Sequence, residues 1–425
     1  MAHIVIKNVG PIKEVELDLN KINVFMGPQS SGKSTIAKII CHCQWVEKQC
    51  FSNYEKQQPV FQSGTKFYDG MVEYHRLEGY FGAKSRIVYS GDYITINYNH
   101  QKQSVSIKRS SKNTFKYPKI AYIPSERNLV AAIPNLKKYN ETNDVILYFM
   151  YDWFSAREAL IEMSLKDVLH HQISYSYSND RDYILDDKKK ILMTNASSGV
   201  QSLTPLMMVL KNNIETIYQK ERPLSYEQMV VKDEALQSFE AVRNALAHSI
   251  FGVNTEELYR RLKSLAIAKP KSQQTIINDY ETFSQLINNS FKYHLSNIYL
   301  EEPEQNLFPE TQGKFVYWLM KLLKDENRNH TLTITTHSPY ILFSLNNCMM
   351  GGLVRENIPN DILQNIESRD AWIDPKKVSI YEIHDGTLKC IQDEDGIIED
   401  NYLNQAYKEN TSEYLSLLNY YDDEK

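Results

Sequence analysis

The chain of 425 residues carries 48 Lys and Arg residues against 53 Asp and Glu residues, which gives a formal net charge of −5. This balance excludes a protein whose whole surface binds nucleic acid, although a local basic patch stays open as an interpretation. Hydrophobic residues make up 42% and charged residues 24%, which is ordinary globular composition. At this length we expect two lobes, or one domain with large insertions.

The N-terminus and the cysteines indicate the compartment. The first residues, MAHIVIKNVGP, lack a charged start followed by an apolar run, and no stretch reaches the roughly 18 apolar residues of a transmembrane helix. The five cysteines are odd in number and show no framework spacing, which favours a reducing compartment. We therefore expect a cytoplasmic protein without membrane contact. The run Cys41-His42-Cys43 falls on a predicted helix, where residues two apart diverge, so no zinc site is expected there.

Three short strands are predicted at the start of the chain: His3–Lys7, Val15–Leu19 and Ile22–Met26. The third is an apolar run bounded by turn residues, which is typical of a buried parallel strand. A helix is predicted from Ser34, because apolar residues recur at helical spacing as far as Val46.

The first chemical motif lies between the third strand and this helix. It matches G-x-x-x-x-G-K-[ST] without a gap, and both flanking elements are those that the motif requires. Its glycines let the loop wrap tightly, so that N–H groups and the helix N-terminus face phosphates. Lys33 is predicted to reach the β- and γ-phosphates of ATP, and Ser34 to ligate Mg²⁺. The predicted phosphate-binding residues are Gly27, Pro28, Gln29, Ser30, Ser31, Gly32, Lys33, Ser34 and Thr35.

Residues 51–110 look like an insertion built of strands. Strands are predicted at Arg86–Tyr89, Tyr93–Tyr98 and Ser104–Ile107, separated by turn residues. Another buried strand, Ala121–Ile123, is expected directly before Pro124.

The middle of the chain is predicted to be mainly helical. Helical patterns cover residues 128–170 and Pro205–Phe291, with a strand pair expected at 173–193. The densest basic cluster falls in the second helical stretch and consists of Arg260, Arg261, Lys263, Lys269 and Lys271. A solvated helix face explains this cluster, while a nucleic-acid contact stays open.

A second Ser- and Gly-rich segment precedes the helical pattern of the middle region. It reads Ala196-Ser197-Ser198-Gly199-Val200-Gln201-Ser202. Ser and Gly at a helix start favour either an anion site or a plain N-cap. Taken alone, the residues favour the cap.

Two apolar strands in the last third of the chain end in polar groups. The strand Asn297–Leu300 runs into Glu301 and Glu302. Glu301 is predicted to hold Mg²⁺, directly or through water, and Glu302 to polarise the attacking water as a general base. The strand Leu332–Thr335 precedes His337, at the strand end where α/β sheets bind ligands. A neutral imidazole there can sense the γ-phosphate; the alternative is a structural histidine. Finally, a hairpin is expected from residue 378 to 391.

The order of these motifs resembles that of ABC-type ATPases of the SMC/RecF/OLD branch. The resemblance also rests on Asn8-Val9-Gly10-Pro11-Ile12, Lys21–Gly27, Glu301-Glu302-Pro303-Glu304, Leu307-x-Pro309 and Thr336-His337-Ser338-Pro339. The chain departs from the family pattern at four positions: transporters have Gly at Val200, Asp is commoner than Glu301, and Asn306 and Phe308 replace the two histidines of His-Leu-His-Pro.

The resemblance implies a fold as well. We expect an α/β ABC-ATPase head with a mainly parallel core sheet, an antiparallel β subdomain and an inserted helical lobe. Residues 1–127 would form the first ATPase lobe with the phosphate loop, and 128–292 the helical lobe with the signature at 197–201. Residues 293–425 would resume the first lobe.

The resemblance further implies a mechanism in which two heads sandwich two MgATP molecules. Ser198, Gly199 and Gln201 would then contact the γ-phosphate held by the partner chain. The segment Gln305–Pro309 would be the D-loop, and Glu126-Arg127 occupies the place of the Q-loop, without its glutamine. A homodimer or higher oligomer is expected.

Two cellular roles follow from the resemblance. The chain is similar to stand-alone ATPase subunits of prokaryotic anti-phage systems (Septu, PARIS and retron-associated operons), which implies a separate effector protein, a nuclease or toxin. A RecF-like DNA-repair ATPase is the alternative. OLD proteins carry a Toprim nuclease, and Asp393 and Asp395 have the Asp-x-Asp spacing of its metal site. They follow a poor strand and lack a clear upstream glutamate, so an acidic hairpin end is favoured.

Overall fold

The computed structural model describes residues 2–52, 54–110, 115–133, 144–169, 172–186, 189–219, 293–324, 328–418 and 420–421. The chain divides into two compact units, residues 1–219 with 295–425 and residues 220–294. The basic cluster at 260–271 lies outside the described residues, and so does most of the helical pattern after residue 219. The fold below is that of the first unit.

Most described strands of this unit belong to one mixed sheet. In chain order they are β1 (His3–Val9), β2 (Ile12–Asp18), β3 (Ile22–Met26), β4 (Phe81–Ser90), β5 (Ile94–Asn99), β6 (Ser104–Arg109), β7 (Pro118–Ile123), β12 (Leu295–Glu301), β13 (Thr331–Thr336), β14 (Val378–His384) and β15 (Thr387–Cys390). Their order across the sheet is β6-β5-β4-β1-β2-β15-β14-β3-β13-β12-β7.

The two halves of this sheet differ in direction and burial. The run β14-β3-β13-β12-β7 is parallel, and every residue of β3 is buried, as expected of strands covered on both faces. The run β6-β5-β4-β1-β2 is antiparallel, and β2 alternates between buried and exposed residues. The predicted fold class, an α/β head with a mainly parallel core and an antiparallel β part, is confirmed.

The register of the parallel half aligns four strand ends. Met26 of β3 pairs with Thr336 of β13, and the preceding Thr335 pairs with Glu301 of β12. Leu300 of β12 in turn pairs with Ile123 of β7. The segments that follow these four strands therefore leave from the same edge of the sheet, where ligands bind in α/β folds.

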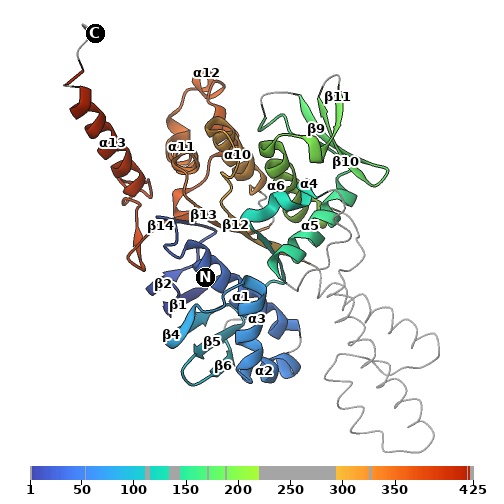
Figure 1. The fold of residues 1–425 in the computed structure, drawn as a ribbon, viewed down its shortest axis with the longest axis vertical. Helices are drawn as coiled ribbons and strands as arrows, with labels where there is room; N and C mark the ends of the chain where they lie inside the picture. Colours follow the sequence, from blue (N-terminus) through green and yellow to red (C-terminus); the bar gives the residue numbers. More distant parts are fainter. Residues whose placement is uncertain are drawn as a thin grey trace, which may run out of the picture. The chain divides into compact units, whose positions relative to one another are not determined.

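The described helices mostly lie beside the sheets, with α13 extending away from them (Figure 1). They are α1 (Lys33–Ser52), α2 (Tyr54–Gln62), α3 (Thr65–His75), α4 (Leu129–Ala132), α5 (Val145–Ala159), α6 (Ser198–Ile214), α10 (Pro309–Leu322), α11 (Pro339–Val354), α12 (Asn360–Leu363) and α13 (Tyr402–Leu418), with short 3-10 turns η1 (Ser125–Asn128), η3 (Met193–Asn195), η4 (Thr216–Tyr218), η5 (Arg355–Asn357), η6 (Glu367–Ala371) and η7 (Pro375–Lys377). No helix within the described ranges is long and apolar enough to cross a lipid bilayer.

A second, smaller sheet corrects the prediction for the middle region. Its strands β8 (Glu162–Ser164), β9 (Ile173–Ser178), β10 (Arg181–Asp186) and β11 (Lys189–Leu192) run antiparallel in the order β11-β10-β9-β8. The sequence predicts a mainly helical segment over residues 128–170, which includes β8, and only a strand pair at 173–193. Asn179 and Asp180 have φ of 51° and 60°, so they form the tight turn that joins β9 to β10.

The segment from residue 51 to 110 also differs from the prediction of strands alone. Helices α2 and α3 precede the strands, and β4 begins at Phe81, before the predicted Arg86. Pro59 lies inside α2 and interrupts the helical sequence pattern of that segment. Helix α3, in contrast, buries Phe67 and Met71 on one face. The predicted lobe boundaries after residues 127 and 292 stay a prediction.

Candidate active site

The loop from residue 27 to 32 joins β3 to α1 in a conformation that needs glycine. Gly27 and Gly32 have φ of 150° and 105°, and Ser30 also has a positive φ of 62°. A Cβ atom on Gly27 would lie 2.7 Å from the Ile383 carbonyl oxygen, and one on Gly32 would lie 3.0 Å from the Ile12 side chain. The two neighbouring segments therefore hold the loop in this tight path.

The tip of this loop is open to solvent, while its base is buried. Pro28, Gln29 and Ser30 are exposed, whereas Thr35 in the first turn of α1 is 5% exposed. The buried hydroxyl of Ser31 has no hydrogen-bond partner among the described residues. An unpaired buried hydroxyl beside exposed backbone is what a bound phosphate would satisfy.

Lys33 is the first residue of α1 and lies folded under the loop. It is 4% exposed, and its Nζ donates to the carbonyl oxygens of Gly27 at 2.9 Å and Pro28 at 2.8 Å. Burial lowers the pKa of Lys33 to about 8, and the charges of Glu302 and Glu304 offset part of that shift. The ammonium thus has neutral partners only and two carboxylates within electrostatic reach.

The first acid of the predicted pair is buried and hydrogen-bonded. Glu301, the last residue of β12, is 6% exposed. Its carboxylate accepts hydrogen bonds from the Tyr122 hydroxyl at 2.5 Å and from the Ser125 N–H at 3.4 Å. Both donors come from the adjoining β7–η1 segment, which no local sequence pattern connects with Glu301.

The second acid, Glu302, is half-buried and faces a histidine. Its Oε1 lies 3.5 Å from the Nε2 of His337, and its backbone has a φ of 41°. The hydrogen bond with His337 lowers the pKa of Glu302 against the opposing effect of burial, and Lys33 and Arg127 lower it further. Glu302 therefore lies beside an imidazole and within electrostatic reach of the Lys33 ammonium, and both groups favour its ionised form.

Glu304, which carried no predicted role, holds the loop that presents His337. Its two carboxylate oxygens accept from the His337 N–H at 2.7 Å and from the Thr336 hydroxyl at 2.9 Å. Burial raises the pKa of Glu304, and these hydrogen bonds oppose that change. The position of the imidazole thus depends on a carboxylate from the preceding strand end.

The structure brings together Lys33, Glu302 and His337, which the sequence predicts to act together, but it places the second Ser- and Gly-rich segment elsewhere. Ser198, the first residue of α6, is exposed. A Cβ atom on Gly199 would lie 2.9 Å from the Asn306 carbonyl oxygen. The start of α6 therefore packs on the segment 305–309 of its own chain.

The Gln201 side chain is already engaged within the chain. Its amide nitrogen donates to the carbonyl oxygens of Met193 at 3.2 Å and Thr194 at 2.9 Å. Among the described residues, no hydrogen bond or ion pair joins Ser198, Gly199 or Gln201 to Lys33, Glu302 or His337.

Two other groups of residues could be considered as metal sites: Asp393 with Asp395, and Cys41 with His42 and Cys43. The Asp393 carboxylate accepts from the N–H groups of Asp395 and Ile397 and so closes a tight turn. Cys41, His42 and Cys43 are buried in α1, where burial lowers the pKa of His42 to about 3. No group of three His, Cys, Asp or Glu side chains that would hold a metal occurs in the described part of the chain.

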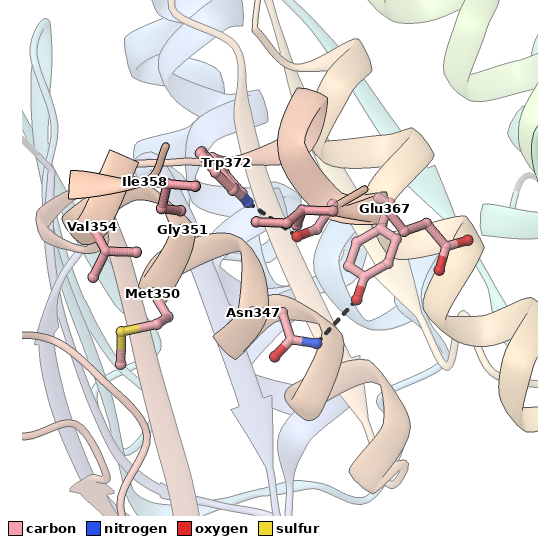
Figure 2. Close-up of a pocket in the computed structure, with 10 residues that line it drawn as sticks. Asn347, Met350, Gly351, Val354, Ile358, Glu367 and Trp372 are labelled. Carbon is pink, nitrogen blue, oxygen red and sulfur yellow. Dashed lines mark hydrogen bonds between the residues drawn. The ribbon is translucent and has the colours of Figure 1, made fainter. Parts of the chain in front are cut away.

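A separate pocket of about 340 Å³ lies beside α11 and contains none of the predicted site residues. Figure 2 shows its lining, in which Trp372 donates to the Ser368 hydroxyl and Asn347 donates to the Tyr317 hydroxyl. This pocket is therefore distinct from the group formed by Lys33, Glu302 and His337.

No protein-family model matches this chain, and no curated protein matches it. Solved structures with a similar fold include an SMC head bound to the C-terminal winged-helix domain of ScpA, at 11% identity and a TM-score of 0.38, covering 92% of this chain and 96% of that chain. The SMC head domain from Thermotoga maritima is 8% identical, with a TM-score of 0.36 and coverage of 92% and 98%. The recombination mediator protein RecF is 11% identical, with a TM-score of 0.31 and coverage of 92% and 97%. We infer the function from the residues of the site.

Proposed function

We propose that this chain is an ABC-type ATPase that binds MgATP and hydrolyses it in a dimer of heads. The observation that carries the proposal is the meeting of Lys33, Glu302 and His337 at the common edge of β3, β13 and β12. A glycine-dependent loop, a buried cation and an ionised acid beside an imidazole are the groups that nucleotide hydrolysis requires.

The residues present fit MgATP. The unpaired Ser31 hydroxyl and the exposed tip of the loop offer donors to phosphate oxygens, and Lys33 would exchange its two carbonyl partners for the β- and γ-phosphates. The Ser34 hydroxyl and the Glu301 carboxylate are hard oxygen ligands of the kind that Mg²⁺ prefers. Bound Mg²⁺ supplies positive charge that offsets the charge on the phosphates.

The protein's part in hydrolysis is proton transfer and positioning. Glu302 accepts a proton from the attacking water, whose oxygen bonds to the γ-phosphorus while the bond from that phosphorus to the ADP oxygen breaks. Its lowered pKa keeps Glu302 in the ionised form needed for this step. To the His337 imidazole, 3.5 Å from Glu302, we assign a hydrogen bond to the γ-phosphate.

A second chain completes the site in this proposal. Ser198 is exposed at a helix start, and Phe308, in the segment against which α6 packs, is 74% exposed. Free N–H groups at a helix start suit a phosphate, yet no described contact links them to the loop of the same chain. A symmetric homodimer is the simplest arrangement that joins each loop to the partner's α6.

We also propose that ATP turnover controls a separate effector, a nuclease or toxin, in cytoplasmic anti-phage defence. This part rests on the resemblance of the motifs; the Asp393 carboxylate, the candidate nuclease ligand, accepts hydrogen bonds within its own turn. The alternative is a RecF-like role in DNA repair. A neighbouring nuclease gene would favour defence, whereas ATP turnover stimulated by double-stranded DNA would favour repair.

Lys33→Ala tests the nucleotide site. It removes the cation beneath the loop, so we expect MgATP affinity to fall by about 10- to 10²-fold, the equivalent of one hydrogen bond to a charged group, about 1.5–3 kcal/mol. Isothermal titration with MgATP measures this change. Lys38→Ala, which removes a half-buried lysine from the same helix, is the matched control and should bind normally. Equal affinity of wild type and Lys33→Ala would contradict the assignment.

A further inference from the structure

Arg127 is a buried arginine, and none of its hydrogen bonds among the described residues goes to a carboxylate. It lies in η1, directly after β7, and is 0% exposed. Its Nη1 donates to the carbonyl oxygens of Glu301 at 2.9 Å and Pro124 at 3.4 Å, and its Nη2 donates to that of Glu302 at 2.8 Å. Burying a guanidinium costs stability, even when carbonyl oxygens accept its protons. The charges of Glu304 and Glu302 favour the cationic form and offset part of this cost, and the carbonyl contacts indicate what the guanidinium holds in place.

The two main contacts of Arg127 restrain the backbone of one residue. The Glu301 carbonyl precedes the Cα of Glu302, and the Glu302 carbonyl follows it, so one planar guanidinium sets the relative orientation of both peptide planes. Glu302 has a φ of 41°, a backbone conformation that residues other than glycine rarely adopt. Arg127 therefore holds Glu302 in a conformation that it would not favour alone.

That conformation determines where the Glu302 carboxylate lies. With the backbone turned in this way, the Glu302 N–H donates to the Thr335 carbonyl oxygen at 2.9 Å. The carboxylate then lies 3.5 Å from His337 and within electrostatic reach of Lys33. A relaxed backbone at Glu302 would move the carboxylate relative to both groups.

We propose that Arg127 is a positioning residue that fixes the carboxylate of Glu302 for proton acceptance, without itself touching the nucleotide. The inference rests on the proposed ATPase function. Its sequence neighbour Glu126 is half-exposed and contacts Arg76 and Ser125 instead, so the role belongs to Arg127 and not to the acid beside it.

The test is Arg127→Lys, which keeps the charge but cannot span two carbonyls as a planar fork, with Arg127→Gln as a neutral second variant. We expect the kcat for ATP hydrolysis to fall about 10²-fold, the cost of misplacing a catalytic group by about 1 Å. The MgATP dissociation constant should stay within about twofold, because Lys33 and its loop are untouched. Arg157→Lys, at a buried arginine of α5 paired with Asp182, is the matched control and should keep wild-type turnover.

Two further readouts separate positioning from a general loss of structure. In the Glu302→Gln background, Arg127→Lys should cause little additional loss of turnover, because the group that it positions has already been removed. Hydrogen exchange at the Glu302 amide should be faster in Arg127→Lys and unchanged in Arg157→Lys. Wild-type turnover in Arg127→Lys, or a full additional loss in the Glu302→Gln background, would overturn the positioning role. A wild-type protein that neither binds nor hydrolyses ATP would instead overturn the proposed function.

Discussion

Two Ser- and Gly-rich segments of this chain start helices, yet their surroundings differ. The loop 27–32 leads into α1 at the edge of the parallel strands, where Lys33, Glu302 and His337 meet. The segment 197–202 starts α6 against residues 305–306 of its own chain, and no described contact connects it with those three side chains. A helix start alone therefore does not make a site, because the charged groups around it decide what it can do.

The largest effect is expected from Glu302→Gln, which tests whether the first region is the reactive one. The amide keeps the size of the acid but accepts no proton, so ATP hydrolysis should slow by about 10²–10⁴-fold while ATP binding persists. Phosphate release and nucleotide titration measure the two quantities, and the variant should accumulate as an ATP-bound dimer. Glu394→Gln, at an exposed acid in the turn 393–397, is the control. Normal turnover in Glu302→Gln would remove Glu302 from the mechanism.

A smaller loss is expected from Ser198→Arg, which probes the second region. Because position 198 is exposed, an arginine there should leave the fold of its own chain intact. Its long side chain would nevertheless block a partner's phosphate from the start of α6. We expect normal MgATP binding and hydrolysis slowed by about 10²-fold, as for loss of a preorganised donor. Undiminished hydrolysis would show that the start of α6 lies outside the site.

A change in pH dependence is expected from His337→Ala. The pKa of Glu302 is held below its ordinary value mainly by the hydrogen bond with His337. Without that bond the pKa rises, so Glu302 becomes protonated at a higher pH as the solution is acidified. The acidic limb of normalised kcat against pH should therefore move to higher pH than in wild type. An unmoved limb would mean that Glu302 and His337 are not coupled.

The smallest effect on turnover is expected from Gln201→Ala, which tests whether Gln201 has the same role as Ser198. Because the Gln201 amide donates to Met193 and Thr194, its removal should affect stability more than chemistry. Turnover should stay within about threefold, whereas the free energy of unfolding should fall by about 1 kcal/mol, typical of a hydrogen bond within a protein, and the Tm should fall with it. A loss of turnover as large as that of Ser198→Arg would place Gln201 in the site instead.

The sequence predicts those parts of the molecule whose structure is encoded by short-range residue patterns. The strand that ends at Met26, the loop that follows it and the pairing of two acids after Leu300 all have short-range patterns, and the structure contains these elements. The contacts of Tyr122 and Arg127 with the acids depend on the register between β7 and β12, which no local pattern encodes.

The same reason explains another missed contact. The Tyr402 hydroxyl donates to the Gly27 carbonyl oxygen at 3.1 Å, although the two residues lie at opposite ends of the chain. Helices α2 and α3 were missed because Pro59 and polar residues interrupt their periodicity. Long-range register and interrupted patterns thus limit what this sequence predicts.

The most direct test of the central claim mixes Lys33→Ala with Ser198→Arg and measures ATP turnover at equal total protein. If each site joins the loop of one chain to α6 of the other, a heterodimer contains one site with both lesions and one site with neither. The account predicts that turnover recovers in part on mixing, although each variant alone turns over ATP far more slowly than wild type. No recovery, with heterodimers confirmed by native mass spectrometry, would contradict a site shared between two chains.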